Sequence, residues 1–155
     1  MTNRILYAGI GSRETPEDIL DIMSKIGKDF YNKGYILRSG KAKGADQAFE
    51  QFVPKLKEIF TAQDAEGRED WLDHASKYHP AWDRCSRFAQ LLHARNSAII
   101  LGDQLNEPVE FVVCWTKGGK LQGGTAQGMR IALDNNIPIF NLFNGTAELR
   151  NYINE

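Results

Sequence analysis

Short hydrophobic runs alternate along the chain with longer stretches in which apolar residues recur at helical spacing. The runs predict strands at residues 5–8, 35–38, 58–61, 110–115 and 137–142. The longer stretches predict helices at residues 15–32, 45–53, 83–101 and 125–135, with a terminal helix from about residue 146. This alternation favours an α/β fold, a single-domain Rossmann-like parallel sheet over residues 1–155 with helices on both faces.

Local signals refine these boundaries. Thr15 is predicted as the N-cap of the first long helix, with Pro16 at its first helical position, and Gly34 follows its end. Residues 63–80 are polar and aperiodic, which predicts a long loop that acts as a lid or specificity segment.

Three aromatic residues belong to this predicted loop or lie beside it, namely Trp71, Tyr78 and Trp82. Aromatic side chains in such a segment either stack on a base or anchor the loop to the core. The sequence supports both interpretations equally.

Three glycine clusters stand where a predicted strand leads into a helix. They are residues 9–13 (GIGSR), 39–46 (SGKAKGAD) and 118–125 (GGKLQGGT). Glycine lets backbone N–H groups approach an anion, and the positive end of the following helix dipole favours negative charge there. Carboxyl ends of parallel strands share one edge of a sheet, so we expect these loops to converge on a nucleotide or another phosphorylated ligand. Ordinary tight turns are the alternative reading.

Two common nucleotide motifs are excluded. The first cluster lacks the third glycine of a dinucleotide fingerprint, because Glu14 occupies its place. The second predicted strand ends in Arg38 and Ser39 rather than in an acid for a ribose. The chain also contains no GxxxxGK[ST] sequence, which argues against a P-loop NTPase.

Composition narrows the function classes further. The 155 residues are 42% hydrophobic and 25% charged, as in ordinary globular proteins, and no segment approaches the length of a membrane span. The start of the chain does not resemble a signal sequence, so we expect a cytoplasmic protein without a membrane partner. The formal net charge of −1 argues against nucleic acid as a partner.

Cysteine and histidine give no recognisable metal motif. His74, His79 and Cys85 lack the spacing of a zinc site, and neither C-x-x-C nor H-E-x-x-H is present, so we expect no metal and no cofactor. Cys114 lies in an apolar run and is predicted to be a buried thiol.

The order of the motifs resembles the SLOG superfamily, especially its YspA/YpsA-related branch. Residues 39–46 are similar to the G-G-A-x-G-A-D loop of that branch, residues 9–13 to its opening G-S-R, and residues 93–96 to its R-N element. The following strand, its glycine-threonine turn and the final strand match in the same order at residues 113–116, 123–125 and 136–139. The resemblance covers nearly the whole chain.

This resemblance implies a Rossmann-like protein that binds nucleotides or nucleotide-derived ligands, often as a homo-oligomer. Relatives include cytokinin-activating phosphoribohydrolases, molybdenum-cofactor carriers and the DNA-processing protein DprA. We therefore expect the chain to bind a small nucleotide-derived phosphorylated ligand as a sensor, carrier or sequestering protein. Hydrolysis or transfer at the N-glycosidic bond of a nucleotide is the alternative, and DprA-like binding of single-stranded DNA is a third.

The phosphoribohydrolases carry a glutamate in P-G-G-x-G-T-x-x-E, and aligning Gly124 and Thr125 with its G-T places Gly128 at that position. Asp46, Glu107 or Glu110 would have to replace the carboxylate in a hydrolase. Catalytic residues therefore stay unassigned.

Candidate ligand-binding residues follow from the loops and the resemblance. Backbone N–H groups of the first and third loops would hold phosphate, arginine or lysine would neutralise its charge, and Asn96 or Asp46 would orient ribose hydroxyls. The predicted set is Gly11, Ser12, Arg13, Ser39, Gly40, Lys43, Gly44, Asp46, Arg95, Asn96, Thr116, Gly123, Gly124 and Thr125.

Overall fold

Five short strands form a fully parallel sheet in the computed structural model of the chain, which describes residues 4–154. The strands are β1 (Leu6–Gly9), β2 (Ile36–Ser39), β3 (Lys57–Ile59), β4 (Phe111–Cys114) and β5 (Ile139–Asn141). Their order in the sheet is β3-β2-β1-β4-β5, and every neighbouring pair is parallel. The predicted α/β Rossmann-like fold class is confirmed.

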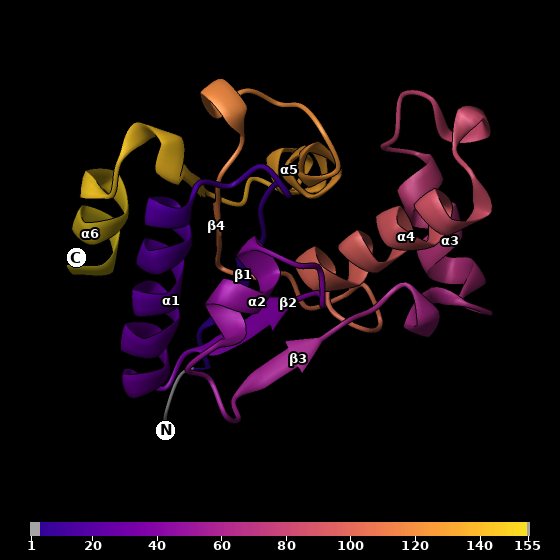
Figure 1. The fold of residues 1–155 in the computed structure, drawn as a ribbon. Helices are drawn as coiled ribbons and strands as arrows, with labels where there is room; N and C mark the ends of the chain where they lie inside the picture. Colours follow the sequence, from indigo (N-terminus) through magenta and orange to yellow (C-terminus); the bar gives the residue numbers. More distant parts are fainter. Residues whose placement is uncertain (1–3, 155) are drawn as a thin grey trace.

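Six α-helices connect and follow the strands (Figure 1). They are α1 (Glu17–Asn32), α2 (Ala45–Glu50), α3 (Glu69–Ser76), α4 (Arg87–Leu101), α5 (Thr125–Asp134) and α6 (Ala147–Asn154). Short 3₁₀ turns are η1 (Gln63–Ala65), η2 (Trp82–Arg84), η3 (Lys117–Gly119) and η4 (Leu142–Asn144). No helix in the described part of the chain is long and apolar enough to cross a membrane.

The alternation of side chains along each strand builds two cores, one on either face of the sheet. In β1, Tyr7 points into the core under α1, α2 and α6, whereas Leu6 and Ala8 point into the core under α4 and α5. Figure 1 shows α1 and α6 on one side of the sheet and α4 on the other, with α3 packed outside α4. The sheet is thus buried on both faces.

The predicted long loop at residues 63–80 is wrong, because this segment contains η1 and α3. Trp71, Leu72 and Ala75 are buried against α4 and η1 in a third hydrophobic cluster. The indole Nε1 of Trp71 donates a hydrogen bond to the Asp103 carbonyl oxygen at 2.8 Å. Trp71 therefore anchors the segment and is not available to stack on a base.

Several predicted boundaries also shift. The N-cap position of α1 is Pro16 rather than Thr15, whose hydroxyl instead donates to the Ser12 carbonyl oxygen at 2.5 Å. α2 ends at Glu50, before the expected residue 53. The helix expected from residue 83 begins at Arg87, because the side chain of Ser86 caps it by accepting a hydrogen bond from the Ala89 amide.

One arginine is almost completely buried within the sheet. Arg38 on β2 is 1% exposed, and its guanidinium pairs with Glu58 at 2.7 Å and with Glu107 at 2.8 Å. Glu58 is also the direct register partner of Arg38 on the edge strand β3.

Candidate functional site

A cavity of about 750 Å³ opens at the carboxyl ends of β1 and β4. In the strand order, β1 leads to β2 on one side while β4 lies on the other, so the connections diverge between β1 and β4. Open α/β sheets bind ligands at such a switch point. The cavity lies between the loop after β1, the start of α5, the face of α4 and the segment that joins α3 to α4.

Nine of the predicted residues line this cavity. They are Gly11, Ser12, Arg13, Asp46, Arg95, Asn96, Gly123, Gly124 and Thr125. The first and third glycine clusters therefore reach one cavity, whereas the sequence led us to expect all three there. The second cluster contributes only Ala42 and Asp46.

The loop after β1 runs beside the end of β4. Its Ile10 and Ser12 amides donate to the Val113 and Trp115 carbonyl oxygens at 3.1 and 3.2 Å. A Cβ at Gly11 would lie 2.5 Å from the Cβ of Ala45 on α2, so this glycine permits close packing of helix and loop. Gly11 is therefore required for the packing of α2 against this loop, in addition to its predicted role in anion binding.

The start of α5 faces the cavity through Gly123, Gly124 and Thr125. Within the described residues, no side chain caps this helix. A Cβ built on Gly123 or Gly124 has no protein atom within 4 Å, which leaves the surrounding space open. The side-chain amide of Asn96 on α4 donates to the Gly124 carbonyl oxygen at 3.5 Å. Helix N-termini of this kind attract anions because of their N–H groups and the helix dipole.

Asp46 and Arg95 form a buried pair of opposite charge in the wall. Their side chains are 5% and 12% exposed, and Arg95 Nη2 lies 3.9 Å from Asp46 Oδ2. Burial raises the pKa of Asp46, and this shift is partly opposed by the charge of Arg95 and the Ala42 N–H. Among the described residues, nothing accepts a hydrogen bond from Arg95 Nε, although this atom is buried. The guanidinium therefore retains capacity to donate hydrogen bonds.

Gly40 lies behind this pair. A Cβ at Gly40 would lie 2.7 Å from both the central guanidinium carbon of Arg95 and Asp46 Oδ2. The missing side chain is what lets Arg95 pack against the loop after β2. Gly40 thus supports the site without lining the cavity.

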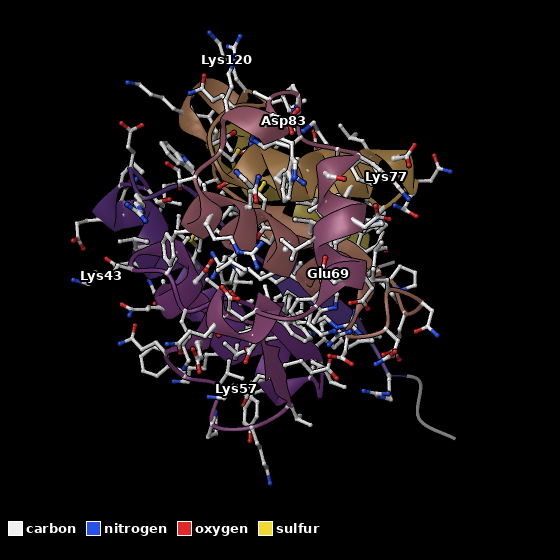
Figure 2. The ribbon with its side chains drawn as sticks, turned by 90° about the vertical axis from the view of Figure 1, so that its right-hand side faces the viewer. Lys43, Lys57, Glu69, Lys77, Asp83 and Lys120 are labelled. Carbon is white, nitrogen blue, oxygen red and sulfur yellow. The ribbon has the colours of Figure 1, made fainter. Side chains whose placement is uncertain are left out.

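Four further predicted residues lie outside the cavity lining. Ser39 is fully buried, and its hydroxyl donates to the Gly9 carbonyl oxygen at 2.6 Å. Thr116 is also buried and accepts a hydrogen bond at 2.7 Å from the side-chain amide of Asn141, which joins the ends of β4 and β5. Gly44 adopts a positive φ of 94° immediately before α2. Lys43 is exposed, and in Figure 2 its side chain points outward at the edge of the molecule.

Sequence reasoning missed much of the remaining wall. Glu14, His79, His93 and Arg130 line the cavity, together with Ile10, Ala42, Pro80, Ala89, Leu92, Gln122 and Ala126. Residues 89, 92, 93 and 96 lie on one face of α4, because they follow helical spacing. Asn96 was already a predicted site residue, so this spacing would have identified His93. His79 lies in the segment between α3 and α4, where no periodic signal points to the cavity.

The charge of the lining is mixed, with three arginines, Arg13, Arg95 and Arg130, against the acids Glu14 and Asp46. Arg130 is held in place because its Nε donates to the Tyr78 carbonyl oxygen at 2.8 Å. The pKa of His93 is lowered to about 4 by burial and by the nearby positive charges of His79 and the arginines. Near neutral pH, His93 is therefore uncharged.

The carboxylates considered as replacements for the hydrolase glutamate are not gathered here. Glu107 is bound to Arg38, and the Glu110 amide bonds to Leu6 at the opposite edge of the sheet. Neither residue lines the cavity, which leaves Asp46 of the three. At Gly128 a Cβ would lie 3.0 Å from the side chain of Ile10 and 3.7 Å from that of Ile100, so a glutamate there would press against apolar side chains.

His79 and His93 meet Cys85 at one end of this wall, and these three residues have the side-chain chemistry to hold a metal ion. Comparisons of the chain with family models, curated proteins and solved structures find no match. The resemblance to the SLOG superfamily consequently rests on the sequence motifs alone, and the cavity is the basis for any functional conclusion.

Proposed function

We propose that this protein binds a small nucleotide-derived, phosphorylated ligand in the cavity between β1, β4, α4 and α5. The observation that carries the proposal is the uncapped start of α5, which opens into the same cavity as the arginine side chains. The cavity volume of about 750 Å³ is in the range of small-molecule sites, which span roughly 300–1,000 Å³.

The arrangement suits an anion in a specific place. A phosphate near Gly123 and Gly124 would meet backbone N–H groups and the positive end of the α5 dipole. Arg95 offers a buried guanidinium whose Nε has no partner among the described residues, and charge-assisted hydrogen bonds of this type are short and strong. Asn96, whose side-chain amide donates to the Gly124 carbonyl oxygen, would bind a ribose hydroxyl.

A second candidate is hydrolysis or transfer at the N-glycosidic bond of a nucleotide. Asp46 favours it, because its carboxylate is in the cavity wall and burial raises its pKa, as in many general acids. The close packing around Gly128 opposes the borrowed hydrolase mechanism. Binding without turnover is therefore the preferred function.

Ligand-linked stability tests the binding proposal. A panel of nucleoside mono- and diphosphates, cyclic nucleotides and ADP-ribose is added to the protein, and thermal unfolding is followed. A ligand at about 100 times its Kd adds roughly 2.7 kcal/mol to the free energy of unfolding, which is readily detected. If no compound at millimolar concentration shifts the midpoint or gives heat in calorimetry, the proposal fails.

Two variants then locate the site. Gly124→Val fills open space at a residue with ordinary helical dihedrals (φ −64°, ψ −32°), so the protein folds but the ligand is blocked. Arg95→Met removes the buried charge, and Arg38→Met is the control because Arg38 is also buried but pairs with Glu58 and Glu107, which do not line the cavity. Unchanged affinity in both cavity variants, with folding verified by circular dichroism, would show that the ligand binds elsewhere.

Chromatography distinguishes the two candidates. We expect no free base to be released from nucleoside 5′-monophosphates beyond the uncatalysed rate. A general acid or base contributes about 10²- to 10⁴-fold, so catalysis by Asp46 would be visible. Turnover by the unmodified protein that is lost in Asp46→Asn, with ligand affinity retained, would establish the enzyme instead.

A further inference from the structure

Two histidines and a cysteine meet at one end of the cavity wall. The side-chain donor atoms of His79, Cys85 and His93 all lie within 4.8 Å of one another. The sulfur of Cys85 is 3.8 Å from Nε2 and 3.9 Å from Nδ1 of His79, and the rings of His79 and His93 have centroids 4.4 Å apart. Three donors of metal-ligating type therefore surround one small volume.

These distances are close to those of a metal site. Zinc–nitrogen bonds of about 2.0–2.1 Å and zinc–sulfur bonds of about 2.3 Å in a tetrahedron place neighbouring donors roughly 3.3–3.6 Å apart. The Cys85–His79 separations exceed this by only a few tenths of an ångström. The other donor separations are at most 4.8 Å, so the longest of them would have to shorten by about 1 Å for the three side chains to hold one ion.

An independent observation concerns His93. Its Nδ1 is buried and has no hydrogen-bond partner among the described residues. Buried polar atoms are nearly always paired, so an orphaned imidazole nitrogen calls for an explanation. The ring belongs to α4, a helix fixed by the cores on both sides, which makes His93 a rigid donor.

The side-chain types of His79, Cys85 and His93 are compatible with metal binding. Histidine binds metal only in its neutral form, and cysteine binds as the thiolate. The thiolate charge would partly offset a divalent cation next to Arg130 and Arg95.

We propose that His79, Cys85 and His93 bind a divalent transition-metal ion, for which Zn²⁺ is the best match. Two imidazoles and a thiolate are the donors that zinc prefers, and a tetrahedral ion held by three side chains keeps a fourth position for water or a ligand atom. His79 and His93 line the cavity, so we infer that a ligand bound there could reach this position. The proposal does not depend on the identity of the phosphorylated ligand.

Metal binding would change one existing contact. Nδ1 of His79 accepts a hydrogen bond from the Ala81 amide at 3.0 Å, which leaves the proton of the neutral ring on Nε2. Coordination through Nε2 moves this proton to Nδ1, while coordination through Nδ1 replaces the amide. In either case the Ala81 amide loses its acceptor, so its NMR signal should shift when metal binds.

Metal titration of the full chain tests the site. The protein is first dialysed against a chelator, and Zn²⁺ is then titrated in competition with a chromophoric chelator. Co²⁺ is titrated separately, because its absorption spectrum reports both a thiolate ligand and tetrahedral geometry. We expect one ion per chain, a cobalt–thiolate band and a shift of the Ala81 amide signal.

The variants use the remaining residues of the same types as controls. The chain has three histidines and two cysteines, so His74 and Cys114 are natural matches. His74 bonds to Ser97, and Cys114 is buried in β4. Loss of a residue that only orients a ligand costs about 10- to 100-fold in metal affinity. Cys85→Ala and His93→Gln should therefore weaken binding by more than about 100-fold, whereas His74→Gln and Cys114→Ala should not.

Three results would overturn the proposal. They are no saturable binding of Zn²⁺, a cobalt spectrum without a thiolate band, and unchanged affinity in Cys85→Ala. If His93→Gln does not fold, Cys85→Ala decides alone, because Cys85 is only partly buried and lies outside the helices. Failure of nucleotide binding would leave these measurements unaffected.

Discussion

Replacing Arg95 with methionine should destabilise the protein in a strongly pH-dependent way. Methionine keeps an unbranched stem beside Gly40 but leaves Asp46 without its partner charge. At the observed 3.9 Å, two unit charges in a medium of effective dielectric constant about 20 attract each other by about 4 kcal/mol. Loss of the desolvated guanidinium offsets part of this attraction, so the net cost is smaller.

Protonation of Asp46 sets an independent upper limit on this cost. The orphaned carboxylate can bind a proton, and at pH 7 this costs about 4 kcal/mol relative to an ordinary aspartate pKa of about 3.9. At pH 5 the same limit is about 1.5 kcal/mol. We therefore expect Arg95→Met to lower the free energy of unfolding by about 2–4 kcal/mol at pH 7, and by less than about 1.5 kcal/mol at pH 5.

The folded-state pKa of Asp46 determines whether stability rises or falls with pH. Burial holds this pKa above its ordinary value, so the folded protein binds the proton more readily than the unfolded chain does. The resulting stability is present below the ordinary pKa and is lost as the pH rises through the folded pKa. Removal of the Arg95 charge raises the folded-state pKa of Asp46 further. The loss of stability in Arg95→Met is therefore largest at high pH.

Urea denaturation at pH 5 and pH 7 measures this difference. Asp46→Asn provides the background for a double-mutant cycle, in which Arg95→Met should cost less and lose most of its pH dependence. A deficit that is equal at both pH values, or larger at pH 5, would refute the assigned coupling between the two side chains.

Three further predictions concern the same region. Gly40→Ala should lower the free energy of unfolding by about 1–3 kcal/mol, because the added methyl group would overpack against Arg95. Gly124→Ala adds a methyl group with no atom within 4 Å, so it should change the free energy of unfolding by less than about 0.5 kcal/mol. Equal effects of the two variants in urea denaturation would contradict this prediction. Gly128→Glu should lower the free energy of unfolding by at least about 2 kcal/mol, because its side chain would be forced against Ile10. Chromatography should still detect no release of free base by this variant. A stable variant that releases base would count against the described packing. If both proposals hold, Zn²⁺ and inorganic sulfate, an anion that binds Zn²⁺ only weakly in solution, should each increase the affinity for the other by the same factor in calorimetry, and independent binding would separate the two sites.

The parallel sheet was predictable because its central strands β1, β2 and β4 are buried on both faces and therefore appear as hydrophobic runs. Residues 110–115 show this most clearly, and they contain β4. α3 was not predictable in the same way, since it presents only Trp71, Leu72 and Ala75 to the core and is otherwise polar. A short helix that covers another helix, rather than the sheet, needs few apolar positions.

The candidate site was predictable in part for a similar reason. Glycine-rich turns after strands mark the edge where loops converge, which brought Ser12 and Gly124 to one cavity. The meeting of His79, Cys85 and His93 depends on how the chain returns from α3 to α4, and their sequence spacing carries no such information. Likewise, Thr116 and Ser39 occupy strand ends, yet their hydroxyls are used by neighbouring backbone and side-chain groups.

The burial of Arg38 affects how the edge strand β3 aligns with β2. Its partner Glu58 is directly opposite on β3, a strand of only three residues. A shift of β3 by one residue would turn Glu58 to the other face and put the neighbouring Lys57 or Ile59 opposite a buried positive charge. Such a slip is therefore penalised electrostatically, and the ion pair between Arg38 and Glu58 adds to the backbone hydrogen bonds that set the register of this short strand.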